Sequence, residues 1–516
     1  MYKGTSLPIV MDKGGFYPSK NIDTIPPTHF ILGKNLNLVD GGRTKRGGSS
    51  HRLASQIDSG SQILGLHWFK LKNGTNKIVV GTASGKLYDS SDLVTAIKTG
   101  LTVDKLFQME TFLNQCYICN ATNQVQVWTG SGTTTDLTSP HADWGTTSPR
   151  QLIKHGQGAS ERLWAIGVPG YEDKLYYTSD GTDSFVGISP LIIASNEGGI
   201  VGAVEFGDRL IVFSKYHAYI VDDTDTDVAL WGFAQAQWDG GVASHRLVIK
   251  TPNDVVCITP DGDIYSVGAV QSYGDYKAAS IARPAFIDTW IRENVTLSTL
   301  PTDAFGVYDP VLRAIKIFVK RIGQSEVDTA LLYFIDRPPN EAWVIHDNLT
   351  SVSGYSASVG CIGYDSNSNT KVLTGGYDGW VWQLEDATKS DNSNGYYSGF
   401  TTTYMDFDNP KQKKRYDKLH IITKQEGNYN LNIKVYIDGV YKATKTMNMG
   451  LIGSVYGTGQ YGTATYSGED LLQNKVDLRF VGVRISYEIY NQNAGEDFFL
   501  SRLVTDFQGL GTKEGY

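Results

Sequence analysis

The sequence predicts an all-β protein with an N-terminal extended arm, a six- to seven-bladed β-propeller and a C-terminal antiparallel β-sandwich. Two observations support this fold class. First, a pattern of apolar strand, turn and second apolar strand recurs between residues 75 and 386, and no helix pattern of comparable strength occurs. Second, the chain changes after residue 390 to longer strands in which apolar and polar residues alternate. Recurring hairpins are typical of propeller blades, and alternating strands are typical of a sandwich.

Residues 1–60 form the predicted arm. They contain Pro8, Pro18, Pro26 and Pro27 with many Gly and Ser and little periodicity, so they cannot build a core of their own. We therefore expect the arm to be ordered only where it packs on another element.

Residues 61–390 form the predicted propeller. Each repeat joins two runs rich in Val, Ile, Tyr and Trp through a turn with Gly, Asp or Asn, which is the pattern of a β-hairpin. Strong copies span residues 77–91, 116–130, 162–180, 208–223, 254–268 and 371–386, and a more divergent copy spans residues 305–346.

Residues 391–516 form the predicted sandwich. A polar break at residues 386–395 precedes them, and about five strands with period-two alternation follow. The Gly- and Tyr-rich stretch at residues 457–470 is predicted to be a long loop, and long loops in compact domains usually make contacts.

Charge and hydropathy argue against a nucleic-acid-binding protein, a secreted protein and a membrane-spanning protein. The formal net charge of -8 argues against a protein that grips nucleic-acid phosphates, because such binding needs clustered Lys and Arg. The first 15 residues lack the apolar run of a secretory signal, and no later run is long enough for a membrane span. We expect a soluble chain that folds in the cytoplasm.

The pair Cys116 and Cys119 has the spacing of a metal or redox motif. It lies inside an apolar strand, however, where residues three positions apart face opposite sides of a sheet. We therefore expect these cysteines to pack in the core.

No motif for a nucleophile, a metal or a phosphate-binding loop occurs, so the sequence predicts no catalytic residue, no metal and no cofactor. Residues 178–185 come near the Asp-box of sialidase-type propellers, but a blade turn explains them equally. A glycosidase would need a carboxylate pair, which distant blades can supply without a local signature.

Two basic segments are candidate docking sites for acidic partners. The first contains Arg43, Lys45 and Arg46 between glycines, which permit close backbone approach. The second is a predicted turn with Lys411, Lys413, Lys414 and Arg415. The alternative for both segments is a solvated basic turn without a partner.

Several segments together resemble one family of virus proteins. They are the turn GGRTKRGG at residues 41–48, the hairpin LYYTSDGTDSF at 175–185, the segment FGDRLIVFSKYHAYIVDD at 206–223 and the blade at 229–268. Between an N-terminal arm and a final β-sandwich, these segments resemble the tail hub or nozzle proteins of short-tailed bacteriophages, the tail tubular proteins that stabilise packaged DNA. The family usually has Arg-Pro-Gly after the basic turn, where this chain has Arg-Gly-Gly at residues 46–48.

This resemblance implies a structural role in the tail of a virion that is assembled in the host cytoplasm. It implies a homo-oligomeric ring, typically a hexamer, below the portal and adaptor proteins, with tail fibre or spike proteins as further partners. Double-stranded DNA would pass along the ring axis without sequence-specific binding. A closed propeller with few exposed edges is rigid and suits a protein that bears internal pressure. A net charge of -8 would let DNA pass through the channel without binding to it.

Two other classes of function remain open. One is a tail-tip propeller that binds or cleaves carbohydrate, for which Trp380 and Trp382 are the best aromatic candidates, although core packing also explains them. The other is a cellular propeller scaffold that binds protein partners, although the sequence lacks the WD and Kelch signatures.

Overall fold

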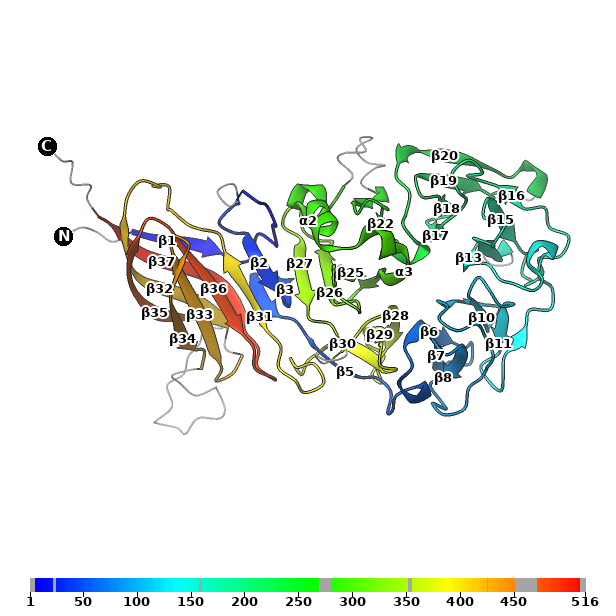
Figure 1. Cartoon of the computed structure of the whole chain (residues 1–516), viewed down its shortest axis with the longest axis horizontal. Coiled ribbons are helices and arrows are strands. Elements are labelled where there is room, and N and C mark those ends of the chain that lie inside the picture. The colour runs from blue at the N-terminus through cyan, green and yellow to red at the C-terminus, as the bar shows by residue number, and fades with distance from the viewer. Residues whose placement is uncertain are drawn as a thin grey trace. The chain divides into compact units, whose positions relative to one another are not determined.

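The computed structural model describes residues 5–21, 25–156, 160–225, 227–268, 280–350, 355–424, 426–450 and 471–510 (Figure 1). The predicted loop at 457–470 lies outside the described residues. In the described part the fold is all-β, with short helices such as α2 (Ile287–Asn294) and α3 (Leu300–Asp303). None of the described helices has the length and apolar character that crossing a membrane requires.

The chain folds into two compact units. Unit 1 comprises Met1–Ser49, Leu331–Asp347 and Glu385–Tyr516, and unit 2 comprises Ser50–Ala330 and Asn348–Leu384. The sequence predicts three consecutive regions with boundaries at residues 60 and 390. The two units instead interleave, because strands from the predicted arm pair with C-terminal strands.

Unit 2 is built from small antiparallel sheets whose strands follow one another in the sequence. The first three sheets comprise β6 (Ile63–Lys70), β7 (Asn76–Thr82) and β8 (Lys86–Asp89); β9 (Gln108–Phe112), β10 (Gln115–Cys119), β11 (Gln126–Trp128) and β12 (Thr135–Asp136); and β13 (Gln151–His155), β14 (Arg162–Ile166), β15 (Lys174–Tyr177) and β16 (Leu191–Ile192).

The later sheets of unit 2 continue this order, except that the N-terminal strand β5 (Gly48–His51) joins the last of them. They comprise β17 (Gly202–Phe206), β18 (Arg209–Phe213), β19 (His217–Asp222) and β20 (Gly232–Asp239); β21 (Val248–Lys250), β22 (Val255–Ile258) and β23 (Ile264–Ser266); β24 (Phe305–Asp309), β25 (Ala314–Val319) and the start of β26 (Thr329–Phe334); and β28 (Val359–Tyr364), β29 (Thr370–Gly375), β30 (Val381–Asp386) and β5 (Gly48–His51).

The first strands of these sheets close into a cycle. Strand β6 contacts β9, and the contacts continue through β13, β17, β21, β24 and β28 back to β6. Figure 1 shows the small sheets of unit 2 arranged around a common centre. Small antiparallel sheets arranged radially around an axis define a β-propeller. Each of the six strong repeats coincides with two consecutive strands, which confirms that these repeats are blade hairpins. The divergent copy at residues 305–346 is not a single hairpin, because it spans the four strands β24, β25, β26 and β27 (Trp343–Asp347).

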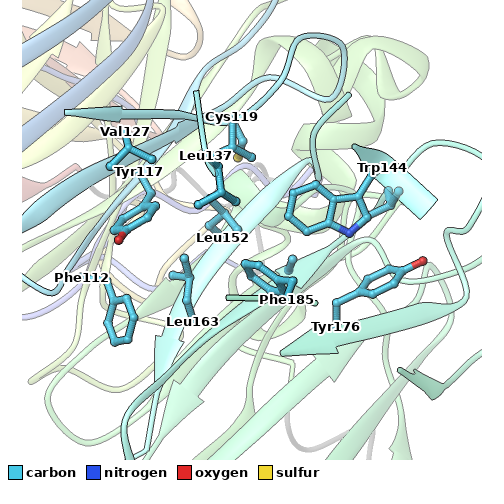
Figure 2. Close-up of a cluster of buried hydrophobic side chains, with 13 residues drawn as sticks. Phe112, Tyr117, Cys119, Val127, Leu137, Trp144, Leu152, Leu163, Tyr176 and Phe185 are labelled. Carbon is cyan, nitrogen blue, oxygen red and sulfur yellow. The ribbon is translucent and has the colours of Figure 1, made fainter. Parts of the chain in front are cut away.

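Apolar side chains between neighbouring sheets hold the propeller together. Figure 2 shows one such cluster, in which side chains from the sheet of β9–β12 meet side chains from the sheet of β13–β16. Full burial of each large apolar side chain contributes about 1.5–3 kcal/mol. The labelled members are Phe112, Tyr117, Cys119, Val127, Leu137, Trp144, Leu152, Leu163, Tyr176 and Phe185.

The two strand cysteines belong to opposite faces of β10, as predicted. Cys119 lies in the cluster of Figure 2, whereas Cys116 packs with Phe69 and Trp128 in the cluster on the other face. Burial raises the pKa of both thiols. The prediction that this pair packs in the core is confirmed.

Unit 1 contains two sheets. One has the order β3 (Leu36–Val39), β4 (Gly42–Lys45), β37 (Phe499–Gly509), β32 (Lys414–Lys424) and β35 (Leu471–Gly482), and β1 (Thr5–Val10) also pairs with β37. The other runs from β27 (Trp343–Asp347) through β2 (Phe30–Lys34), β31 (Ser398–Thr402), β36 (Ile485–Asn491) and β33 (Asn430–Ile437) to β34 (Val440–Asn448).

Burial alternates along the strands of unit 1, so each sheet has one apolar face. Strand β33 buries Leu431, Ile433, Val435 and Ile437, and the residues between them are less buried. Strand β1 lies antiparallel to β37, from Thr5 opposite Phe507 to Val10 opposite Arg502. The predicted arm is therefore ordered by strands of the same chain.

Candidate functional site

The first basic segment, Arg43, Lys45 and Arg46, is buried. The three side chains belong to β4 and the residue after it, and at most 2% of each residue is exposed. The glycines around them allow backbones to approach closely: a Cβ on Gly42 would lie 2.2 Å from the Leu500 carbonyl oxygen, and a Cβ on Gly47 would lie 2.4 Å from the Cα of Glu385. The segment therefore packs inside unit 1.

Arg46 forms a two-point ion pair with Asp391. Its Nη1 donates to Asp391 Oδ1 over 2.9 Å, and Nη2 donates to the other carboxylate oxygen. Its Nε donates to Asn35 Oδ1 over 3.0 Å, and the guanidinium carbon lies 3.8 Å from the centre of the Tyr396 ring. Such fork-to-fork pairs fix geometry as well as charge.

Lys45 extends into a polar pocket of unit 1. Its Nζ donates to the Asn493 carbonyl over 2.7 Å and to Asn491 Oδ1 over 3.3 Å. It lies 4.4 Å from the centre of the Tyr396 ring. Burial, reinforced by the neighbouring Arg46, lowers the pKa of Lys45 to about 8.

Arg43 is enclosed by aromatic rings and carbonyl groups. Its Nη2 donates to the carbonyls of Lys13 and Thr28 over 3.0 and 2.5 Å. Its guanidinium carbon lies 4.6 Å and 4.9 Å from the centres of the Phe30 and Phe400 rings. Burial lowers the pKa of Arg43.

These positions change the expectation for the first segment. A salt bridge to a partner protein needs an accessible head group, and all three head groups are used within unit 1. Neither sequence interpretation, a solvated turn or a docking surface, described a cation inside a core. The signal that could have found it is the flanking glycines, which indicate close packing of backbones.

The second segment divides between the core and the surface. Lys414 is buried, and its Nζ donates to the carbonyls of Asn409, Gln412 and Val483. Lys414 therefore stabilises the turn through hydrogen bonds to backbone carbonyls and is not available to a partner protein. The other three cations are exposed on the same turn and the start of β32: Lys411, Lys413 and Arg415.

A cavity of about 760 Å³ opens at one end of the propeller axis in unit 2. Its lining comes from the segments that lead into the first strands of successive sheets. This common end brings together residues that lie far apart in the sequence, so no local sequence pattern indicates it. The lining includes Gln62, Leu106, Arg150, Val201, His245, Asp303 and Ser358.

The first strands also carry one carboxyl group with a strongly shifted pKa. Burial raises the pKa of Glu110 on β9 to about 7, and Glu205 on β17 adds to this rise. Lys154 on β13 and the backbone amide of Thr111 act in the opposite direction. Glu205 is itself held by Lys250, whose Nζ lies 3.1 Å from its carboxylate.

The two tryptophans considered for sugar binding do not line the cavity. Trp380 stacks on His51 with ring centres 3.6 Å apart, and the ring of Trp382 lies 4.3 Å from the same histidine. Trp382 is 2% exposed. Both rings pack within the blade, as the alternative explanation proposed.

Among the residues that the structure describes, no group of three or more His, Cys, Asp or Glu could hold a metal ion. Residues 178–185 form a turn whose Phe185 belongs to the cluster of Figure 2. The Phe185 amide donates to the Ser139 carbonyl, and the Leu163 amide donates to Thr178 Oγ1. These contacts show that the Asp-box-like residues form and anchor a turn between strands of the blade.

Comparison with known proteins gives only distant likenesses. No protein-family model matches the chain. No curated protein matches it either. Among solved structures, BamB from Moraxella catarrhalis has 11% identity and a TM-score of 0.37, with 66% of this chain and 97% of that chain covered. YCF48 bound to D1 peptide has 11% identity and a TM-score of 0.36, with 66% and 99% covered. PorZ from Porphyromonas gingivalis has 13% identity and a TM-score of 0.37, with 78% and 46% covered. At such scores these likenesses carry no argument about function, and the propeller assignment depends on the closed cycle of strands.

Proposed function

We propose that the chain is a structural protein of a bacteriophage tail, in which copies form a nozzle or hub ring below the portal and adaptor. The ring retains packaged DNA and forms the channel through which the DNA enters the host. In this proposal the propeller has seven blades, which begin with β6, β9, β13, β17, β21, β24 and β28, and unit 1 is a β-sandwich.

The observation that supports this role best is the pairing of N-terminal strands with C-terminal strands. In unit 1, β1 and β37 form a continuous antiparallel ladder over Thr5–Val10. Strand β5 is the last strand of the sheet that contains β28, β29 and β30. A row of backbone hydrogen bonds holds each N-terminal strand to its C-terminal partner, and such closure leaves few free sheet edges. Both properties suit a protein under internal pressure.

The exposed cations Lys411, Lys413 and Arg415 are the proposed contact with a neighbouring subunit or tail protein. Exposed charges steer association and select the partner more than they add affinity. An acidic partner surface would complement them.

Electron microscopy tests the proposal. The purified full-length chain, and the same chain mixed with portal or adaptor protein, should form closed rings with six-fold symmetry and a central channel. Immunogold labelling of virus particles should place the chain at the tail. Particles labelled elsewhere, or monomers under both conditions, would contradict the proposal.

A further inference from the structure

We infer that the axial cavity of the propeller binds a small multivalent oxyanion, meaning a ligand with two or more carboxylate or phosphate groups. This inference concerns unit 2 alone and does not depend on the proposed tail function.

The cavity is built where all the first strands begin. Leu64 lies at the start of β6, Gln108 begins β9, Arg150 precedes β13, and Ser358 precedes β28. An end of the axis is the one place in a propeller to which every blade contributes. Ligands that need several contacts at once therefore fit there.

Three exposed cations line the cavity without an acidic partner. Lys105 and Arg150 lie on the segments that lead into β9 and β13, and Lys215 lies in the turn between β18 and β19. Within the described ranges none of the three forms an ion pair. Unpaired charges of one sign around a cleft focus the field on it and attract ions of the opposite sign.

A fourth cation, Arg246, is bonded to two residues of the lining. Arg246 donates through Nη1 to the Thr302 carbonyl over 2.7 Å and through Nη2 to the Ser358 carbonyl over 2.5 Å. Carbonyl oxygens satisfy these hydrogen bonds, and Asp303 is the carboxylate whose negative charge acts on Arg246. Burial lowers the pKa of Arg246 to about 10, so the group stays charged at neutral pH.

The acidic residues of the lining do not neutralise this excess. Asp303 lies 2.5 Å from Lys320 and also acts on Arg246, so it balances one of these two cations, and Asp104 is the other acid of the lining. The local charge is therefore positive, although the whole chain carries -8. An oxyanion would supply the missing counter-charge.

Two neutral polar groups of the lining are already bonded within the chain, which argues against an uncharged sugar as their ligand. Gln108 is bonded to Leu152 through both ends of its amide, and Ser358 Oγ donates to the carbonyls of Ile63 and Gly375. These groups are occupied within the chain. The cations offer free donors, and charge-assisted bonds to oxyanions are the strongest that such donors form.

His245 supplies a spectroscopic reporter in the lining. Its Nδ1 is buried and has no hydrogen-bond partner among the described residues. Burial, with Arg246 and Arg150 nearby, lowers its pKa to about 3, so the ring is neutral. A bound anion would partly offset these positive charges and raise the pKa of His245.

Calorimetric titration of the full-length chain tests the inference. The probes are tripolyphosphate, citrate and a hexapeptide of glutamate, with neutral maltotriose as the comparison. We expect the anions to bind, and the variant Arg150→Gln/Lys215→Gln to bind them at least about tenfold more weakly. The matched control Lys70→Gln/Lys72→Gln removes the same charge from exposed positions at the other end of β6 and should bind like the parent chain.

The probes also distinguish two sources of the oxyanion. Tighter binding of citrate or tripolyphosphate would indicate a free small molecule, and tighter binding of the peptide would indicate an acidic segment of a protein. In either case nuclear magnetic resonance should show a raised pKa of His245. The inference fails if no anion binds, if maltotriose binds equally well, or if both double variants lose affinity equally while circular dichroism shows them folded.

Discussion

Arg46 and Asp391 form a buried two-point ion pair although 345 positions separate them in the sequence. Their side chains are 3% and 4% exposed. Ser49 Oγ also donates to Asp391 over 3.0 Å, and Asn35 accepts from Arg46. The pair joins the chain just before the propeller strands to the chain just after them. Each charge is compensated only while the other is present.

Replacing Arg46 with Met should therefore destabilise unit 1 by about 3–5 kcal/mol, because it leaves the buried carboxylate of Asp391 without a counter-charge. Urea unfolding, monitored by hydrogen exchange of the amides of unit 1, measures this change in the free energy of unfolding. The control Arg415→Met removes a half-exposed arginine that pairs with Asp417, and it should change stability by less than about 1 kcal/mol. Equal effects of the two substitutions would show that the buried pair has no special role.

Lys45 should make stability depend on pH in the alkaline range. Its pKa falls from 10.5 to about 8 on folding, so between these values the unfolded chain binds a proton that the folded chain does not. The free energy of unfolding should therefore rise with pH above 8, and the cost of the buried charge is fully present below that pH. Lys45→Met should remove a rise of about 2 kcal/mol between pH 8 and 10. Denaturation curves of both proteins across this range test it, with the exposed Lys442→Met as the control that should keep the rise.

Removal of residues 1–11 should weaken unit 1 and leave the propeller intact. The deletion takes away β1, which covers one side of β37 from Arg502 to Phe507. We expect faster hydrogen exchange in β37 and unchanged exchange in β18 of unit 2. Leu7→Ser, at a residue that is 38% exposed, keeps the backbone ladder and serves as the control.

A larger deletion of residues 1–35 should also impair incorporation into particles, and infectious virions built from it would argue against the proposed assembly.

Charge reversal at Lys411, Lys413 and Arg415 to Glu should impair assembly most at low salt, because exposed ion pairs are screened as ionic strength rises. The number of rings counted by electron microscopy at about 0.05 M and 0.5 M salt measures this effect. Reversal of the exposed Lys442 and the half-buried Lys445, which lie on β34, is the control for a change of net charge alone. Normal assembly of the triple variant at both salt concentrations would favour a solvated turn.

Purified protein should not hydrolyse host capsular polysaccharide, lipopolysaccharide or peptidoglycan. Glu110, whose pKa is raised to about 7, is the acid best placed to challenge this expectation, because glycosidase acids have raised pKa values. Released reducing ends measure the activity. Turnover that Glu110→Gln abolishes and Glu161→Gln preserves would indicate an enzyme instead of a structural protein.

The strands could be predicted from the sequence because their information is local. The hairpin around residues 77–91 follows from alternating apolar residues and a Gly turn, and the opposite faces of Cys116 and Cys119 follow from the two-residue period of a strand. The partner of β1 could not be predicted, because pairing across some 500 residues leaves no local pattern in the chain. For the same reason Arg46 looked like a surface cation, since its counter-charge is far away in the sequence. The axial cavity depends on every blade at once and is equally invisible along the chain.

Strand β5 has a consequence for the order in which the molecule can form. It is made before the strands of the propeller, yet it belongs to the sheet that β30 completes, so it must wait until Asp386 has left the ribosome. Strand β1 waits longer still, for β37 near the other end of the chain. Pairings of such high sequence separation fold slowly and leave unpaired strand edges exposed in the meantime. We therefore expect synthesis of this protein to depend on chaperones that shield β1 and β5 until their partners arrive.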